Sequence, residues 1–188
     1  HGSSSTGAGL TALAAFHRGF DLPKPTQHYI ASPYPYRNEA GSDPQTVING
    51  SVAALKKAVA EIGADNVAAF FTEPIQGSGG VIVPPKGWLK AMAQTCKELD
   101  ILFVADEVIT GFGRTGPMFA CDAEGVEPEL PGAGVGAIIT TVALTGVVAT
   151  VTKVTVPAFF AAAGVDPDFP GATAAEVPPL EVVALAVH

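Results

Sequence analysis

The sequence predicts an α/β fold in which a mostly parallel β-sheet carries helices on both faces. Helical patterns and short apolar runs alternate along residues 43–105, an order that favours parallel strands joined by crossover helices. Each apolar run also ends on an acidic residue, Glu73 or Asp106. Open α/β sheets bind ligands at the carboxyl ends of their strands, so both observations indicate the same fold class.

The first predicted element is a helix that begins at Asp43-Pro44 and ends at Gly63. Aspartate is a favourable N-cap, proline suits the first helical position, and glycine commonly ends a helix. Between them the apolar residues recur at alternating spacings of four and three and form one helical face: Ile48, Val52, Leu55, Val59 and Ile62.

Two strands and a second helix follow. The runs VAAFFT (67–72) and ILFVA (101–105) are short and apolar, as expected of buried parallel strands. Between them, Pro84-Pro85 precedes a helix whose apolar face carries Trp88, Met92, Cys96 and Leu99. Residues 1–41 are rich in Gly, Ser and Pro, and we expect residues 25–44 to be a long ordered loop that its aromatic side chains hold on the surface.

Composition excludes some classes of function. The chain has 188 residues and a formal net charge of −8, with no basic cluster, which argues against nucleic-acid binding. Cys96 and Cys121 fit neither a disulfide framework nor a paired metal motif, and two isolated thiols favour a cytoplasmic protein. The sequence shows no signal peptide, and because it opens at His1 rather than Met, we expect the natural N-terminus to lie upstream.

The motif GFGRTG at residues 111–116 matches G-x-G-x-x-G literally. A dinucleotide fingerprint needs these glycines in a tight turn between a strand and a helix. Here Pro117 interrupts the expected helix, and no acidic partner for a ribose follows. We interpret the match as accidental.

The carboxylates of Glu73 and Asp106 are the candidate site. A carboxylate at the end of an apolar strand is costly unless it meets a cation or a hydrogen-bond donor, and a protonated pyridine nitrogen would serve. Alternatively, Asp106 caps a nearby helix and Glu73 pairs with a surface arginine. Spacing alone leaves both interpretations open.

Two long segments resemble the class III, pyridoxal-phosphate-dependent aminotransferases: EPIQGSGGVIVPPKGWLKAM (73–92) and DILFVADEVITGFGRTGPMFACDAEGVEPEL (100–130). The opening HGSSSTGAGLTALAAFH also resembles the segment that follows the family's cofactor-stacking aromatic residue. The amino-acid sequence of the first segment is most similar to those of the omega-amino-acid and amine:pyruvate transaminases. The resemblance implies part of the large domain of fold-type I pyridoxal-phosphate enzymes, with pyridoxal phosphate as cofactor. It also implies an amine or amino-acid donor, a keto-acid acceptor such as pyruvate, and a homodimer.

The resemblance also implies roles for single residues. Asp106 would pair with the pyridinium nitrogen and keep the cofactor ring an effective electron sink, and Val108 would pack against the face of the ring. Glu73 would lie on the substrate side, where some members use it to hold a mobile arginine. The family's phosphate-binding motif and its stacking aromatic would lie upstream of His1.

This chain departs from the family mainly in lacking the lysine that forms the Schiff base with the cofactor. It should fall just under thirty residues beyond Asp106, and position 135 is Val135. The next lysine, Lys153, lies 47 residues beyond Asp106 in the unrelated context VTKVTV. The sequence therefore predicts a chain with no catalytic lysine and no turnover.

The composition changes after Leu130. Residues 131–188 hold five of the 28 charged side chains, so we expect a partial aminotransferase cofactor-binding domain at 1–130 and an unrecognised tail at 131–188. Three interpretations of the tail stay open: a spurious continuation such as a frameshift, β-strands near 138–142 and 151–156, or a membrane span, which is the least favoured. The alternative to a transaminase is a non-catalytic remnant or a regulatory partner of an intact aminotransferase. If the tail is a membrane span, it would tether this remnant or partner to a membrane.

Overall fold

The computed structural model describes residues 1, 4–127, 139–144, 147–152 and 181–186. Its α-helices are α1 (Ser5–Leu10), α2 (Pro44–Ile62), α3 (Trp88–Glu98) and α4 (Ala120–Ala123). Its strands are β1 (Gln27–Ala31), β2 (Val67–Thr72), β3 (Leu102–Ala105), β4 (Ile139–Leu144), β5 (Val147–Thr152) and β6 (Glu181–Ala186).

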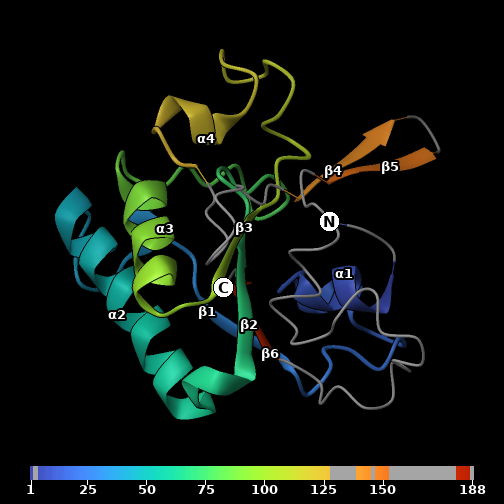
Figure 1. Cartoon of the computed structure of the whole chain (residues 1–188), viewed down its shortest axis with the longest axis horizontal. Coiled ribbons are helices and arrows are strands. Elements are labelled where there is room, and N and C mark those ends of the chain that lie inside the picture. Colours follow the sequence, from blue (N-terminus) through green and yellow to red (C-terminus); the bar gives the residue numbers. More distant parts are fainter. Residues whose placement is uncertain (2–3, 128–138, 145–146, 153–180, 187–188) are drawn as a thin grey trace, which may run out of the picture.

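The main sheet has the strand order β1-β6-β2-β3, and all three pairings are parallel. Helices α2 and α3 lie on one side of this sheet and the short α1 lies on the other (Figure 1). Strands β4 and β5 form a separate antiparallel hairpin. The predicted α/β fold with a parallel sheet and helices on both faces is confirmed.

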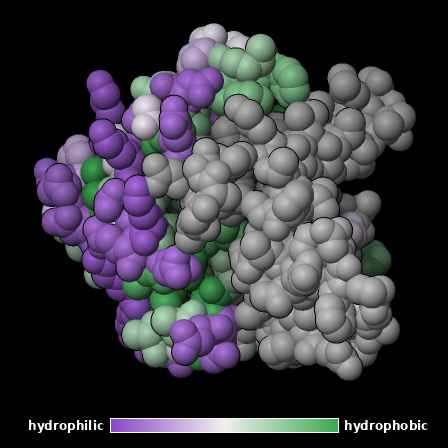
Figure 2. All heavy atoms as spheres, viewed as in Figure 1, coloured by the Kyte–Doolittle hydropathy of each residue, from purple (hydrophilic) through white to green (hydrophobic). Residues whose placement is uncertain are grey.

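Helix α2 begins and ends as the sequence predicts. The side chain of Asp43 accepts a hydrogen bond from Thr46 N–H at 2.9 Å, which satisfies a donor of the first turn. Gly63 stops the helix with φ +97°, a conformation that glycine adopts without strain. Figure 2 shows hydrophilic residues over the region of α2 and α3, because only one stripe of each helix is apolar.

The core lies between these two helices and the sheet. Trp88, Met92 and Cys96 from α3 and Leu55 and Val59 from α2 are at most 1% exposed. The strands supply Phe70 and Phe103, whose rings meet at a centroid distance of 6.3 Å. This packing fixes β2 and β3 and therefore the residues that follow them.

The expectation of a loop over residues 25–44 is wrong at its start. Residues 27–31 form strand β1, in which Gln27 is 7% exposed and Ile30 is 6% exposed. Helix α1, which the sequence analysis did not predict, packs over β1 through a hydrogen bond from Tyr29 Oη to Gly9 O. Both elements are short, and β1 pairs with a strand about 150 positions away in sequence, so no local pattern marks it.

Strand β6 occupies a central position of the sheet. The β1–α2–β2 crossover skips one sheet position, and residues 181–186 fill it by pairing with β1 and with β2. The hairpin strand β4 overlaps the first strand expected in the tail, whereas most of the second lies outside the described residues. The described part of the chain contains no helix that is long and apolar enough to cross a bilayer.

Candidate functional site

Glu73 and Asp106 emerge at one edge of the sheet. Glu73 directly follows β2 and Asp106 directly follows β3. The Asp106 N–H donates to the carbonyl oxygen of Thr72 at 2.7 Å, which continues the parallel ladder one residue past β3. Adjacent parallel strands deliver their next residues to the same edge, so the fold brings together the two carboxylates that the sequence singles out.

The Asp106 carboxylate is partly buried, with 16% of its side chain exposed. One oxygen accepts a hydrogen bond from Val108 N–H at 3.2 Å, and the other contacts the amino nitrogen of His1. Among the described residues, Asp106 caps no helix and Glu73 meets no arginine. The structure therefore does not show the alternative in which these two side chains only cap a helix and pair with a surface arginine.

The Glu73 carboxylate lies beside that of Asp106 with 22% of its side chain exposed. Burial, followed by the nearby negative charge of Asp106, raises the pKa of Glu73 to about 7. Gly77 N–H lies 3.5 Å from Glu73 Oε1, and the imidazole Nε2 of His1 lies 3.8 Å from the same oxygen. The neutral and ionised forms of Glu73 are therefore close in free energy near neutral pH.

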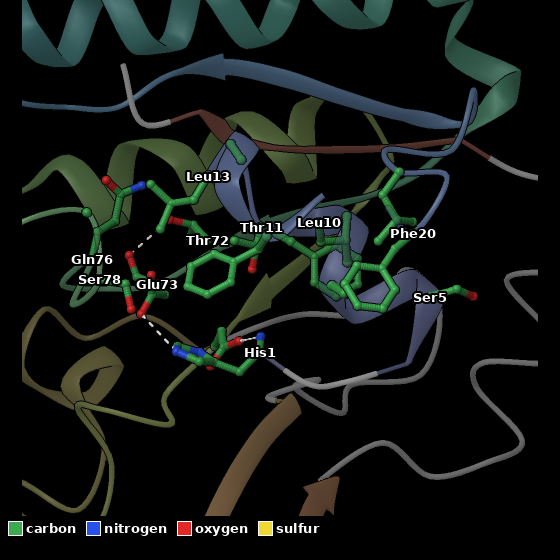
Figure 3. Close-up of a pocket in the computed structure, with 17 residues that line it drawn as sticks. His1, Ser5, Leu10, Thr11, Leu13, Phe20, Thr72, Glu73, Gln76 and Ser78 are labelled. Carbon is green, nitrogen blue, oxygen red and sulfur yellow. Dashed lines mark hydrogen bonds and ion pairs between the residues drawn. The ribbon is translucent and has the colours of Figure 1, made fainter. Parts of the chain in front are cut away.

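A cavity of about 700 Å³ opens beside these carboxylates. Figure 3 shows Glu73, Gln76 and Ser78 at one end of the cavity, whereas Phe20 and Ser5 lie at the other. Its wall is largely apolar and includes Leu10, Leu13, Phe16, Phe20, Leu22 and Phe71. None of the described residues that line it is a lysine or an arginine. The volume and the apolar wall are typical of small-molecule sites.

Gln76 is a polar lining residue that the sequence reasoning missed. It is 4% exposed, and its Oε1 atom has no hydrogen-bond partner among the described residues. An unpaired buried acceptor costs about 1–3 kcal/mol, and this oxygen has under 1 Å² of accessible surface, so it is sealed from the cavity. The available signal was a glutamine in the turn directly after a buried strand.

Glu107 is a second residue that sequence reasoning missed, and its role is structural. It is 0% exposed, and its carboxylate accepts hydrogen bonds of 2.9 Å from the N–H groups of Ala120 and Cys121. Thr110 Oγ1 donates to it as well. Glu107 thus ties the segment after β3 to the start of α4 and holds the backbone next to Asp106.

The remaining residues that the sequence analysis singled out do not line the cavity or lie outside the described residues. Val108 is half-buried two residues beyond Asp106 and is absent from the residues that line the cavity. Val135 and Lys153 lie outside the described residues. Arg114, the arginine of the motif GFGRTG, is exposed on the turn after β3, where its N–H donates to the carbonyl oxygen of Gly111 at 3.5 Å.

Comparison with known proteins gives consistent matches. The family model described as Aminotransferase class-III matches residues 1–150. A putrescine–pyruvate aminotransferase of Pseudomonas aeruginosa is 43% identical over 130 residues, which are 69% of this chain and 28% of that protein. A probable mitochondrial gamma-aminobutyrate transaminase 3 of Oryza sativa subsp. indica is 39% identical over 131 residues, covering 69% of this chain and 26% of that protein.

A solved structure of a transaminase is similar to this chain as well. An amine transaminase from an uncultivated Pseudomonas species, in a PLP-bound form, superposes with a TM-score of 0.68 at 32% identity. The superposition covers 75% of this chain and 30% of that one. The chain thus spans less than a third of the length of each of these relatives.

Proposed function

Because the chain belongs to the class III aminotransferase family, we propose that residues 1–130 form the ring-binding part of a transaminase. The reaction is transfer of an amino group from an amine or omega-amino acid to a keto acid such as pyruvate. Members of this family use pyridoxal phosphate, and the names of the two similar proteins above include putrescine and gamma-aminobutyrate as donors. Those names support an amine or omega-amino acid as the donor class.

The observation that carries the proposal is the placement of Asp106. Its carboxylate lies at the carboxyl end of β3, lines the cavity and is only 16% exposed. One oxygen of that carboxylate contacts the amino group of His1 here, and a protonated ring nitrogen would supply a charge and an N–H of the same kind. When bound, pyridoxal phosphate supplies an electron sink for the substrate's α-carbon. Asp106 would hold the proton on the ring nitrogen.

Val108 and Glu73 would act around the same ring. Val108 donates its N–H to Asp106 at 3.2 Å, so the two residues form one turn. We assign the Val108 side chain to the face of the ring and Glu73 to the donor side of the cavity. Both assignments follow from the family resemblance, and the position of Glu73 in the cavity wall supports the second.

The cavity offers a partner for the ring nitrogen of the cofactor at Asp106, but it offers no lysine to bind the cofactor covalently. No lysine is present among the described residues that line the cavity, and the expected position holds Val135. A lysine is needed to bind the cofactor covalently and to move the proton between the two carbon atoms of transamination. This chain should therefore bind the cofactor weakly and without a covalent bond, and it should not turn over.

A cofactor titration of the whole chain tests the proposal. Circular dichroism in the visible band of pyridoxal phosphate reports a cofactor held in an asymmetric site. We expect a signal only at cofactor concentrations of roughly 1 mM or above, a binding free energy near −4 kcal/mol. Asp106→Asn should abolish the signal. Asp65→Asn, at an exposed position just before β2 and so at the end of that strand opposite Glu73, should leave it unchanged.

Two results would contradict parts of the proposal. Equal signals from the wild-type chain and Asp106→Asn would remove Asp106 from the ring site. Production of alanine from pyruvate and an amine donor would refute the loss of turnover, and micromolar cofactor binding would refute the weak-binding part.

A non-catalytic partner of an intact aminotransferase is the second candidate, and the missing lysine favours it. Homodimers are implied for the family, and this chain would pair with a second copy or with the intact enzyme. Light scattering of the purified chain, alone and mixed with an active class III aminotransferase, tests this role. A monomeric mass in both samples would argue against it.

A further inference from the structure

The cavity has two walls that belong to different parts of the chain. Asp106 and residues between 71 and 79 form one wall at the ends of β2 and β3, whereas residues between 5 and 22 form most of the other. Figure 3 shows Thr72 and Glu73 of the first wall and Leu13 and Phe20 of the second. No strand runs through residues 5–22. The shape of the cavity therefore depends on what holds this second wall opposite the end of β2.

Helix α1 attaches the second wall to β1. The side chain of Gln27 donates to the carbonyl oxygen of Thr6 at 2.9 Å, and the Tyr29 hydroxyl donates to that of Gly9. Gly9 is buried, and a Cβ added to it would meet the Gln27 side-chain amide. Helix and strand are therefore in direct contact, and the second wall takes its position from β1.

Strand β6 is the hydrogen-bonded link between β1 and β2. Among the described residues, β6 pairs with both strands, whereas β1 and β2 do not pair with each other. Ile30 of β1 also packs in the core cluster that contains Leu55 of α2. Apolar packing is non-directional, so this contact does not fix the register of β1 along β2. The position of β1, and with it the second wall, thus depends on β6.

The slot that β6 fills, between residues 27–31 and residues 67–72, fits it unequally on its two sides. Residues 27–31 pair one to one with residues 182–186, whereas the register against β2 shifts between Val67 and Ala69. Such irregularities are rare in parallel pairs and disrupt the ladder locally. We expect the pairing of β6 with β2 to open more readily than its pairing with β1.

We propose that this slot is a strand-acceptor site, and that its occupant, the tail segment 181–186, assembles the cavity by fixing β1 and α1 opposite the ends of β2 and β3. The recognition chemistry is strand addition, in which main-chain N–H and C=O groups of the acceptor pair with an extended segment. The inference goes beyond the proposed function, because it assigns a role to the tail and holds for any small molecule that contacts both walls. Binding of such a molecule and insertion of the strand favour each other equally.

Amide hydrogen exchange of the full chain tests the inference without a ligand. Val183→Pro removes a main-chain donor from β6, and Val183→Ile is the matched control that keeps it. We expect Val183→Pro to lower the protection of residues 27–31 and of α1 at least roughly tenfold more than that of α3. A merely structural role of β6 would lower the protection of α1 and α3 by the same factor, because both would then exchange through global unfolding.

A peptide with the sequence of residues 178–188 tests whether the slot accepts a strand from outside. Added to Val183→Pro, it should restore the protection of residues 27–31 and of α1, whereas the same peptide with proline at position 183 should not. Fluorescence anisotropy of the labelled peptide should show saturable binding to Val183→Pro. Binding to the wild-type chain should be at least roughly tenfold weaker, since its own strand competes at a high effective concentration.

A disulfide keeps the inference testable if Val183→Pro does not fold. Ala31 and Ala186 are paired in the register of β1 and β6, and neighbouring strands lie about 4.8 Å apart, within the Cα range of a disulfide. The oxidised double variant Ala31→Cys, Ala186→Cys should be a cross-linked monomer. Its residues 27–31 should exchange on the order of tenfold more slowly than in the reduced form, and Ala31→Cys alone should show no such change.

Three results would overturn the inference: equal loss of protection in α1 and α3 of Val183→Pro, equal binding of the two peptides, or failure of the double variant to cross-link within one chain. The circular dichroism of bound pyridoxal phosphate separates this inference from the proposed function. If the wild-type chain gives no cofactor signal, the proposed function fails and the exchange data still decide the role of β6. If Val183→Pro keeps the wild-type signal, the cavity does not need β6 and only this inference fails.

Discussion

The contribution of Glu73 to the stability of the chain should fall as the pH rises from acid to neutral. Burial and the charge of Asp106 raise the pKa of Glu73 from 4.5 to about 7. In the unfolded chain the carboxyl has its ordinary pKa, so folding favours the neutral form. The stability that this neutral carboxyl provides is complete below about pH 4.5 and is lost as the pH rises through 7.

The size of the effect follows from the two pKa values. Each tenfold change in the ionisation equilibrium is worth about 1.4 kcal/mol, so a change from 4.5 to about 7 corresponds to about 3 kcal/mol. Three groups face Glu73 and titrate or carry charge: the Asp106 carboxylate, the amino group of His1 and the imidazole of His1. The comparison that isolates Glu73 from them is Glu73→Gln, a variant of nearly the same size that does not ionise.

Urea unfolding of the wild-type chain and Glu73→Gln between about pH 4 and pH 8 is the assay. At low pH the two free energies of unfolding should agree, and near pH 8 Glu73→Gln should be more stable by about 3 kcal/mol. Parallel pH profiles for the two proteins would refute the reasoning, because they would mean that Glu73 ionises normally in the folded chain.

Three further predictions concern the scaffold of the site, each checked by the free energy of unfolding. Glu107→Leu should cost about 3 kcal/mol or more, because it leaves buried N–H groups at the start of α4 unpaired, whereas Glu61→Leu on the exposed face of α2 should change stability by under about 0.5 kcal/mol; equal effects would contradict this. Gly77→Ala should cost no more than about 1 kcal/mol, because the atom that its Cβ meets is the terminal Cδ1 of the half-buried Ile109, which can rotate aside; a cost of about 3 kcal/mol or more would contradict this. Val183→Pro should cost about 3 kcal/mol or more, because it removes an N–H from a strand that pairs on both sides; unchanged stability would mean that β6 is not needed in the sheet.

The elements that the sequence predicted well carry strong local signals. Helix α2 has an N-cap at Asp43, a stop at Gly63 and a periodic apolar face, and its observed bounds match. The apolar run before Glu73 became β2, residues 67–72, as predicted, and the run before Asp106 became β3 at 102–105. The chain order of these elements implies a parallel sheet, so the meeting of the two carboxylates could also be predicted.

The features that the sequence did not predict depend on contacts between distant segments. Strand β1 is five residues long and pairs with β6, which lies at the other end of the chain. Nothing in residues 181–186 alone says that they enter the centre of a sheet. Gln76 and Glu107 were missed for a related reason, since burial is what makes their polar atoms informative, and burial depends on Ile82, Ala120 and other residues brought together by the fold.

The most direct measurement on the central claim concerns the ring nitrogen of pyridoxal phosphate at Asp106. Nitrogen NMR of ring-labelled cofactor, mixed with the chain at millimolar concentration and about pH 8, reports whether that nitrogen is protonated when bound. A carboxylate beside it should keep it protonated. We predict a protonated ring nitrogen with the wild-type chain and an unprotonated one with Asp106→Asn. The same unprotonated signal with both proteins would contradict the assignment of this cavity as a cofactor-ring site.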